Sequence, residues 1–147
     1  MTTYQSCSSA TTKKLGENLA KKILAGRPQN RATVVGLSGE LGSGKTTFIQ
    51  GFFRGMGLRK RALSPTFILM RRVELKNRKF KNLFHIDAYR MKNSREIVQL
   101  GLDKITKNPQ NIVLIEWADT LKRMLPRNTI WVNFKHGKKE RERIIRL

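Results

Sequence analysis

The start of the chain divides into a polar segment and a segment with helical spacing of apolar side chains. Residues 1–10 are small and mostly polar, so we expect them to form a loose lead-in. Within residues 11–25, large apolar residues recur about every four positions, which predicts an amphipathic helix. Thr11 or Thr12 can cap the start of this helix, and Gly26 stands just past its end.

A strand, a glycine-rich turn and a second helix are predicted next. Residues 32–37 are almost continuously apolar, which is typical of a strand that is buried on both faces of a parallel sheet. Residues 45–56 again carry apolar side chains at helical spacing. A strand followed at once by a helix is the repeating unit of α/β folds.

The second half of the chain continues this alternation and adds two hairpins. The predicted strands are 66–73, 80–87, 111–116, 129–134 and 143–147, and the predicted helices are 94–102, capped by Ser94, and 121–125. Short turns at 76–79 and 136–138 join the first and the last pair of strands into hairpins. We see no linker, repeat or low-complexity segment, so residues 1–147 are expected to form a single domain.

The composition narrows the class of protein. The chain has 31 lysines and arginines against 10 acidic residues, a net charge of +21, and its 39% of hydrophobic residues is enough for one core. No apolar run approaches the roughly 20 residues that span a bilayer, and the N-terminus has no apolar signal segment. The single Cys7 cannot form an internal disulfide. We expect a cytoplasmic protein without a membrane partner, with polyanions such as RNA or acidic proteins as neighbours.

The strongest chemical signal is the glycine-rich segment between the first predicted strand and the second predicted helix. Residues 39–46 read Gly-Glu-Leu-Gly-Ser-Gly-Lys-Thr and fit G-x-x-x-x-G-K-[ST], the phosphate-binding loop (P-loop), in the strand–loop–helix context that it requires. Its glycines permit positive φ, so that backbone N–H groups can point at phosphates at the positive end of the helix dipole. The predicted nucleotide-binding residues here are Glu40, Leu41, Gly42, Ser43, Gly44, Lys45, Thr46 and Thr47.

Three side chains of this segment have distinct predicted roles. Lys45 supplies a cation for the β- and γ-phosphates, Thr46 can place its hydroxyl on Mg²⁺, and Thr47 can add a hydroxyl near the α-phosphate. Together with the alternating pattern, the loop predicts an α/β fold. We expect a P-loop NTPase-type three-layer sandwich, with a mostly parallel central sheet and antiparallel hairpins at its edges.

Two acidic residues end predicted strands and compete for the metal. Asp87 ends the strand 80–87, and Glu116 ends the strand 111–116. Because ligands bind outside the carboxyl ends of strands in open α/β sheets, both acids should lie on the same edge as the P-loop. Each can hold Mg²⁺, directly or through water, or orient the attacking water; alternatively, each is a helix cap or pairs with a nearby arginine. We interpret Arg90 as a salt-bridge partner rather than an arginine finger.

Two further residues are candidates for the same site. The stiff Pro65 fixes the approach of Thr66, whose hydroxyl can sense the γ-phosphate and Mg²⁺ as switch loops do. An ordinary loop-to-strand turn explains this segment equally well. Trp117 follows Glu116 and is either a core aromatic residue or a lid over the site.

These motifs, in this order, resemble those of the TsaE (YjeE) family of small bacterial P-loop ATPases. The resemblance covers nearly the whole chain and is carried by Thr12…Leu15-Gly16-Glu17, the P-loop, Ser64-Pro65-Thr66-Phe67, His85-x-Asp87-x-Tyr89-Arg90 and Ile115-Glu116-Trp117. It implies binding and slow hydrolysis of ATP, with Mg²⁺, and a role with TsaB and TsaD in forming threonylcarbamoyl-adenosine on tRNA. It also implies that Lys45, Thr46, Asp87 and Glu116 serve the phosphates and Mg²⁺, that Thr66 is switch-like, and that the segment near Thr12 lies close to the adenine.

Other functions remain open alongside this resemblance. A small-molecule or nucleotide kinase of the P-loop class needs an acceptor pocket, for which 147 residues leave little room. A basic nucleic-acid-binding module with a relic P-loop is disfavoured by the intact Lys45-Thr46 pair. Residues 57–81 hold nine lysines and arginines and one acid. They predict either a surface for tRNA or an acidic partner near the switch-like threonine, or a general basic surface, which we favour.

Overall fold

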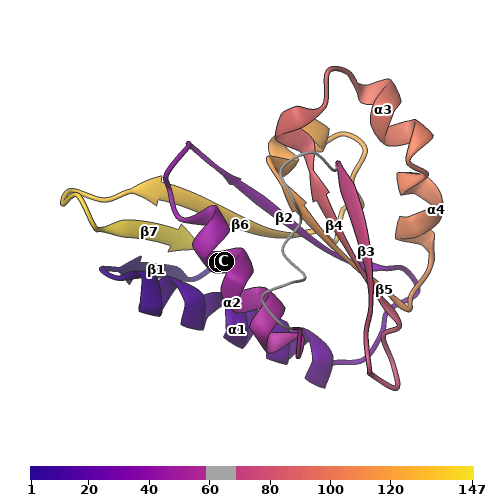
Figure 1. The fold of residues 1–147 in the computed structure, drawn as a ribbon, viewed down its shortest axis with the longest axis horizontal. Coiled ribbons are helices and arrows are strands. Elements are labelled where there is room, and N and C mark those ends of the chain that lie inside the picture. Colours follow the sequence, from indigo (N-terminus) through magenta and orange to yellow (C-terminus); the bar gives the residue numbers. More distant parts are fainter. Residues whose placement is uncertain (59–68) are drawn as a thin grey trace.

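One mixed sheet organises the chain, with its strands in the order β1-β7-β6-β2-β5-β4-β3 (Figure 1). The computed structural model describes residues 1–58 and 69–147. The strands are β1 (Thr3–Ser6), β2 (Thr33–Gly39), β3 (Met70–Glu74), β4 (Asn82–Asp87), β5 (Asn111–Glu116), β6 (Ile130–His136) and β7 (Arg143–Arg146). The α-helices are α1 (Ser9–Ala25), α2 (Lys45–Gly55), α3 (Ser94–Gln99) and α4 (Leu102–Lys107), and two short 3₁₀ helices are η2 (Ala88–Arg90) and η3 (Ala118–Leu121).

The central strands β6, β2, β5 and β4 run parallel, and antiparallel partners complete both edges of the sheet. β3 pairs with β4, and β7 pairs with β6 and β1, so the predicted hairpins at the edges are confirmed. The register pairs Leu37 of β2 with Glu116 of β5, and Glu116 with Asp87 of β4. The carboxyl ends of these three strands therefore lie side by side, and we call this end of the parallel strands the P-loop edge of the sheet.

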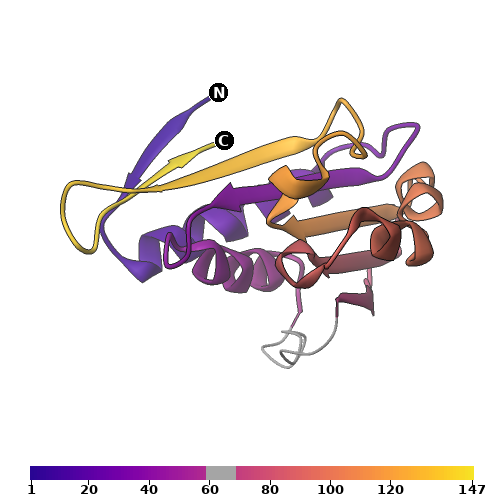
Figure 2. The same ribbon diagram turned by 90° about the horizontal axis from the view of Figure 1, so that it is seen from above.

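Helices cover both faces of the sheet, which gives the predicted three layers (Figure 2). Neighbouring residues of β2 point to opposite faces: Val35 and Leu37 join a core with α1 and α2, whereas Val34 joins a second core with α3 and α4. Phe48 of α2 and Ile97 of α3 are fully buried in these two cores. Burying such a side chain contributes about 1.5–3 kcal/mol, so β2 is held from both sides.

Glycines allow α1 and α2 to cross in close contact. A Cβ atom added to Gly51 would lie 1.9 Å from the backbone oxygen of Lys13, and one added to Gly16 would lie 2.1 Å from that of Phe48. Any larger residue at either position would force the helices apart. The crossing holds the start of α1 beside the start of α2, where a Cβ atom on Gly44 would lie 3.7 Å from the Thr12 methyl group.

The N-terminal segment is more regular than its polar pattern predicts. Residues 3–6 pair with β7 as an edge strand, so the loose lead-in predicted for residues 1–10 is wrong. α1 begins at Ser9, and its cap is Ser8 rather than Thr11 or Thr12, since Ser8 Oγ accepts a 3.1 Å hydrogen bond from Thr11 N. Only Ser6 of the four strand residues is buried, so the strand has no apolar alternation that could reveal it.

Three other elements differ from their predicted bounds. The helix predicted at 94–102 is α3, which ends at Gln99 and is capped by Asn93 rather than Ser94. Gly101, with φ at +78°, separates it from α4, which was not predicted. The helix predicted at 121–125 is wrong: the 3₁₀ helix η3 ends at Leu121, and residues 122–125 form a turn and a bend. Of the strand predicted at 66–73, residues 66–68 lie outside the described residues, and the observed strand β3 runs from Met70 to Glu74. No described helix has the length and apolar character to cross a membrane.

Glu17 joins the two crossing helices through ion pairs. Its Oε2 lies 2.6 Å from Arg54 Nη2 of α2, and its Oε1 accepts a hydrogen bond from Lys21. The hydrogen bonds from Lys21 and Arg54 lower the pKa of Glu17 to about 2. A carboxylate with a lowered pKa stabilises the fold above the pKa of the unfolded chain, about 4.3 for glutamate. This contribution is lost as the pH falls from there toward 2.

We therefore expect Glu17→Gln to lower the melting temperature at pH 7 and to matter less as the pH falls below about 4.3. Thermal unfolding is followed by circular dichroism at a series of pH values down to about 2.5. It measures how the difference in melting temperature between variant and parent decreases in acid. Asp103→Asn is the control, because it breaks the exposed 2.7 Å pair with Lys107 and should have little effect at any pH. A difference between Glu17→Gln and the parent that stays constant in acid would contradict the assignment.

Candidate functional site

The predicted P-loop connects β2 to α2 and has the backbone conformation that glycine permits. Gly39, Gly42 and Gly44 have φ angles of +143°, +70° and +101°. At Gly39 a Cβ atom would also lie 2.5 Å from the backbone oxygen of Phe134, so a larger residue does not fit there. The loop ends at the first turn of the 11-residue helix α2. The free N–H groups and the dipole at such a helix start favour an anion.

Lys45 lies within the P-loop rather than on its surface. Its ammonium donates hydrogen bonds to the backbone oxygens of Gly39 and Glu40, the latter at 2.8 Å. It also lies 4.1 Å from the centre of the Trp117 ring. Burial lowers the pKa of Lys45, and the negative charges of Glu116, Asp119 and Glu40 oppose this shift. The loop thus holds a partly desolvated cation at the position where the motif predicts contact with phosphate.

Trp117 combines its two predicted positions, against the core and over the site. It packs against the core beneath α3 and α4, and its ring also covers the Lys45 ammonium and stacks on Tyr89 with 4.8 Å between ring centres. Its φ of +56° is the only positive value at a non-glycine residue in the described part of the chain. This uncommon backbone conformation turns the ring back over the P-loop directly after β5.

Glu116 and Asp87 lie side by side in register at the P-loop edge, as predicted, but their surroundings differ. Glu116 lines a cavity of about 210 Å³ together with Leu41, Gly42, Gly44, Lys45, Thr46, Thr47 and Trp117. Asp87 instead caps η2 by accepting a 3.1 Å hydrogen bond from Tyr89 N, and it pairs with Arg90 at 3.1 Å. The salt bridge expected for Arg90 is therefore present, and Glu116 is the acid that faces Lys45 and Thr46.

A buried histidine orients Glu116. His85 of β4 lies with Nε2 2.9 Å from Glu116 Oε2, and it packs edge-on against Phe53 of α2. The side chain of His85 is 6% exposed, and its Nδ1 has no hydrogen-bond partner among the described residues. The sequence motif contained His85 without showing its role, because the contact depends on the register between β4 and β5.

The donor set at this edge fits Mg²⁺. Thr46, Glu116 and Asp87 offer hydroxyl and carboxylate oxygens, the ligand types that Mg²⁺ takes in proteins. No group of three or more His, Cys, Asp or Glu side chains able to hold a metal occurs in the described ranges. A Mg²⁺ ion here would take its remaining ligands from phosphate and water, which is usual for Mg²⁺ bound with nucleotides.

The C-terminal hairpin also contacts the P-loop, which no sequence pattern indicated. His136 Nε2 lies 3.1 Å from the backbone oxygen of Leu41, and Arg143 Nε donates a 3.1 Å hydrogen bond to that of Gly42. A second cavity, of about 400 Å³, adjoins the loop here and is lined by Cys7, Ser8, Ser9, Thr12, Gly42, Gly44, Thr47, Arg141 and Arg143. Thr12 thus lies beside the P-loop, whereas its contact with adenine stays a prediction.

Two further sequence predictions concern Thr66 and the basic stretch 57–81. Thr66 and its neighbours Ser64 and Pro65 lie outside the described residues, as do the first three basic residues of the stretch 57–81. Residues 76–81 connect β3 to β4 at the other edge of the sheet, where the parallel strands begin. This basic turn therefore does not form a surface beside the P-loop.

Comparisons with known proteins agree with this geometry. The family described as threonylcarbamoyl adenosine biosynthesis protein TsaE matches residues 6–145. The tRNA threonylcarbamoyladenosine biosynthesis protein TsaE of Bacillus subtilis is 38% identical over 110 residues, which cover 74% of this chain and 66%, just under two thirds, of that protein. The protein of the same name from Rickettsia prowazekii is 36% identical over 125 residues, covering 84% of this chain and 82% of that protein.

A solved structure supports the same conclusion. The crystal structure of Bacillus subtilis YdiB is similar to this fold with a TM-score of 0.72 and 28% identity, over 98% of this chain and 82% of that one. The family match begins at the last residue of β1 and extends into β7 of the C-terminal hairpin that contacts the P-loop. Family match, relatives and fold therefore agree with the resemblance carried by the motifs, and the chain belongs to the TsaE family of threonylcarbamoyl adenosine biosynthesis proteins.

Proposed function

We propose that this chain binds ATP with Mg²⁺ in its P-loop and hydrolyses it slowly. In doing so it supports formation of threonylcarbamoyl-adenosine on tRNA, with homologues of TsaB and TsaD, in the cytoplasm. The observation that carries the nucleotide part is the P-loop, with three glycines at positive φ before α2 and Lys45 buried beside Glu116. Membership of the TsaE family supports the pathway.

The side chains of the site have separable tasks in this proposal. Lys45 exchanges the backbone oxygens of Gly39 and Glu40 for oxygens of the β- and γ-phosphates, where it stabilises charge that develops on the transferring phosphoryl group. Mg²⁺, when bound, neutralises phosphate charge. Thr46 would hold Mg²⁺ through its hydroxyl oxygen, and Glu116, oriented by His85, would hold Mg²⁺ directly or through water, or orient the attacking water.

The proposal also accounts for weak hydrolysis by the chain alone. Among the described residues, none that lines the cavity of Lys45 and Glu116 is an arginine. Arg90, on the adjacent turn, is engaged with Asp87. A second cation that stabilises the transition state would therefore come from a partner, as arginine fingers supplied in trans do.

Reconstituted synthesis of threonylcarbamoyl-tRNA tests the function directly. We expect repeated turnover by TsaB and TsaD homologues to require this chain and ATP, and Lys45→Ala to abolish that support. Hydrolysis by Lys45→Ala should fall on the order of 100-fold or more, since it removes a preorganised cation. ATP hydrolysis by the parent should rise when the partners are added. Equal rates of hydrolysis with and without partners, or full turnover with Lys45→Ala, would contradict the proposal.

The two acids are distinguished by conservative substitutions. We expect Glu116→Gln to retain nucleotide binding and lose most hydrolysis, because Glu116 faces Lys45 and Thr46. Asp87→Asn should have the smaller effect, because Asp87 is already engaged with Arg90 and Tyr89. Calorimetric titration with Mg²⁺–ADP and steady-state hydrolysis of Mg²⁺–ATP separate binding from rate. Normal hydrolysis by both variants would remove the acids from the site.

His85 is expected to act through Glu116 as a positioning residue. Removing the hydrogen bond to a group in or next to a metal site typically costs about 10–100-fold. We expect His85→Phe to lower kcat on this order with little change in KM for ATP. His85→Gln, which keeps an N–H group for Glu116, should recover part of the rate. If the two variants lose stability equally and differ in neither kcat nor KM, His85 has only a structural role.

A further inference from the structure

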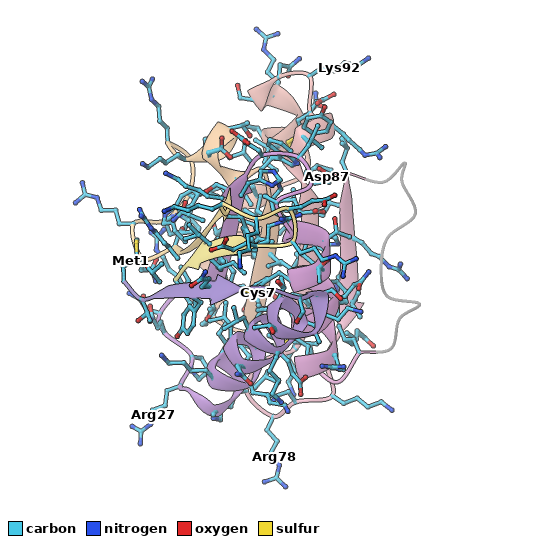
Figure 3. The ribbon with its side chains drawn as sticks, turned by 90° about the vertical axis from the view of Figure 1, so that its left-hand side faces the viewer. Met1, Cys7, Arg27, Arg78, Asp87 and Lys92 are labelled. Atoms are coloured by element: carbon cyan, nitrogen blue, oxygen red, sulfur yellow. The ribbon has the colours of Figure 1, made fainter. Side chains whose placement is uncertain are left out.

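The edge of the sheet opposite the P-loop is built from four connected segments, 26–32, 75–81, 104–110 and 126–129, which we call the amino-edge rim. They precede or join the amino ends of the parallel strands β2, β4, β5 and β6. Hydrogen bonds link the four segments to one another. The donors and acceptors are Lys79 Nζ and Gly26 O at 2.8 Å, Ala32 N and Thr106 O at 3.0 Å, Lys81 N and Gln110 O at 2.8 Å, and Asn128 Nδ2 and Gln29 Oε1 at 2.7 Å. In Figure 3, Arg27 and Arg78 project outward from this end of the molecule, and Asp87 lies toward the other.

The four rim segments carry only positive charge, although the acids Glu74 and Asp103 directly precede two of them. The segments contain no aspartate or glutamate, and their nine basic residues are all exposed: Arg27, Arg31, Lys76, Arg78, Lys79, Lys81, Lys104, Lys107 and Arg127. Among the ion pairs of the described residues, Lys107 with Asp103 is the one that involves a rim residue. Six of the ten acids lie instead in the P-loop, at or after the ends of β4 and β5, and before β7: Glu40, Asp87, Glu116, Asp119, Glu140 and Glu142.

The chemistry of the rim favours a phosphate backbone over other polyanionic partners. Clustered arginines and lysines neutralise phosphates and release their counterions. Arginine can also bind phosphate through two parallel hydrogen bonds. No large hydrophobic side chain is exposed in the four segments, so the rim offers neither an apolar anchor for a lipid surface nor an aromatic platform for unpaired bases.

We propose that the amino-edge rim binds the phosphate backbone of folded RNA, largely independent of base sequence, while the opposite edge of the sheet handles the nucleotide. The choice of tRNA as the RNA rests on the proposed function. The rim lies at the amino ends of the parallel strands, whereas Lys45 and Glu116 lie at their carboxyl ends, so RNA bound to the rim leaves the P-loop open. Lys79 differs from its neighbours, because its ammonium also contacts the last backbone oxygens of α1, and it is best left intact in a test.

Two variants with equal loss of charge test the proposal. The rim variant carries Arg27→Gln, Lys76→Gln, Arg78→Gln and Arg127→Gln. The control variant carries Lys92→Gln, Arg95→Gln, Lys135→Gln and Lys138→Gln, four exposed positions outside the rim. The affinity for unmodified tRNA is measured by fluorescence anisotropy at several salt concentrations, with melting temperature and ATP hydrolysis as checks on fold and P-loop.

We expect the rim variant to bind tRNA at least about 10-fold more weakly and with a shallower salt dependence, since each lost phosphate contact lowers the salt slope by about 0.7–0.9. The control variant should lose much less, and both should keep the parent's melting temperature and hydrolysis. Equal losses in the two variants would overturn the proposal, and so would a loss by the rim variant that appears with polyglutamate but not with tRNA. If the parent binds tRNA through the rim yet hydrolyses no ATP, the proposed function fails and the rim proposal stands.

Discussion

The parallel register of β2, β5 and β4 is the constraint on which the rest of the molecule depends. It aligns the P-loop with Glu116 and Asp87 at one edge of the sheet, and it gathers the connections before the strands at the other. A shift of one residue would turn Val34 and Leu37 toward the wrong cores, so the register is strongly specified by burial on both faces. The same pairing therefore places the P-loop and its acids at one end of the parallel strands and the basic rim at the other. The two sites keep a fixed position relative to each other.

A second constraint brings distant parts of the chain to the nucleotide edge. The glycine contacts between α1 and α2 hold Thr12 beside the P-loop, and the pairing of β7 with β1 and β6 brings Arg143 to the carbonyl of Gly42. The larger cavity is thus formed by the start of α1, the P-loop and the C-terminal hairpin. Substitutions at Gly51, which touches no part of the cavity, would still be felt there because they would displace α1.

Local sequence patterns were sufficient to predict the features whose residues are close together in the sequence. The P-loop was predictable because the glycines, Lys45 and the flanking strand and helix are contiguous in sequence, and Asp87 and Glu116 followed from the rule for strand ends. β1 was missed because a short polar strand has no periodic signal. The contact between His85 and Glu116 was missed for another reason: it arises from pairing between β4 and β5, and local sequence patterns do not reveal which strands are neighbours.

The placement of the acids, more than the net charge, determines the field at the nucleotide site. Lys45 is the cation buried there, and Glu116, Asp119 and Glu40 all act on it. Three carboxylates act on this one ammonium and offset its charge, although the chain as a whole carries +21. A triphosphate adds further negative charge, so its binding is strongly favoured by a divalent cation that both phosphates and Glu116 can share. The basic rim does not replace that cation, because it lies at the opposite edge and salt screens exposed charges over about 10 Å. Nucleotide binding at this site should therefore depend on Mg²⁺ more than on the overall charge of the protein.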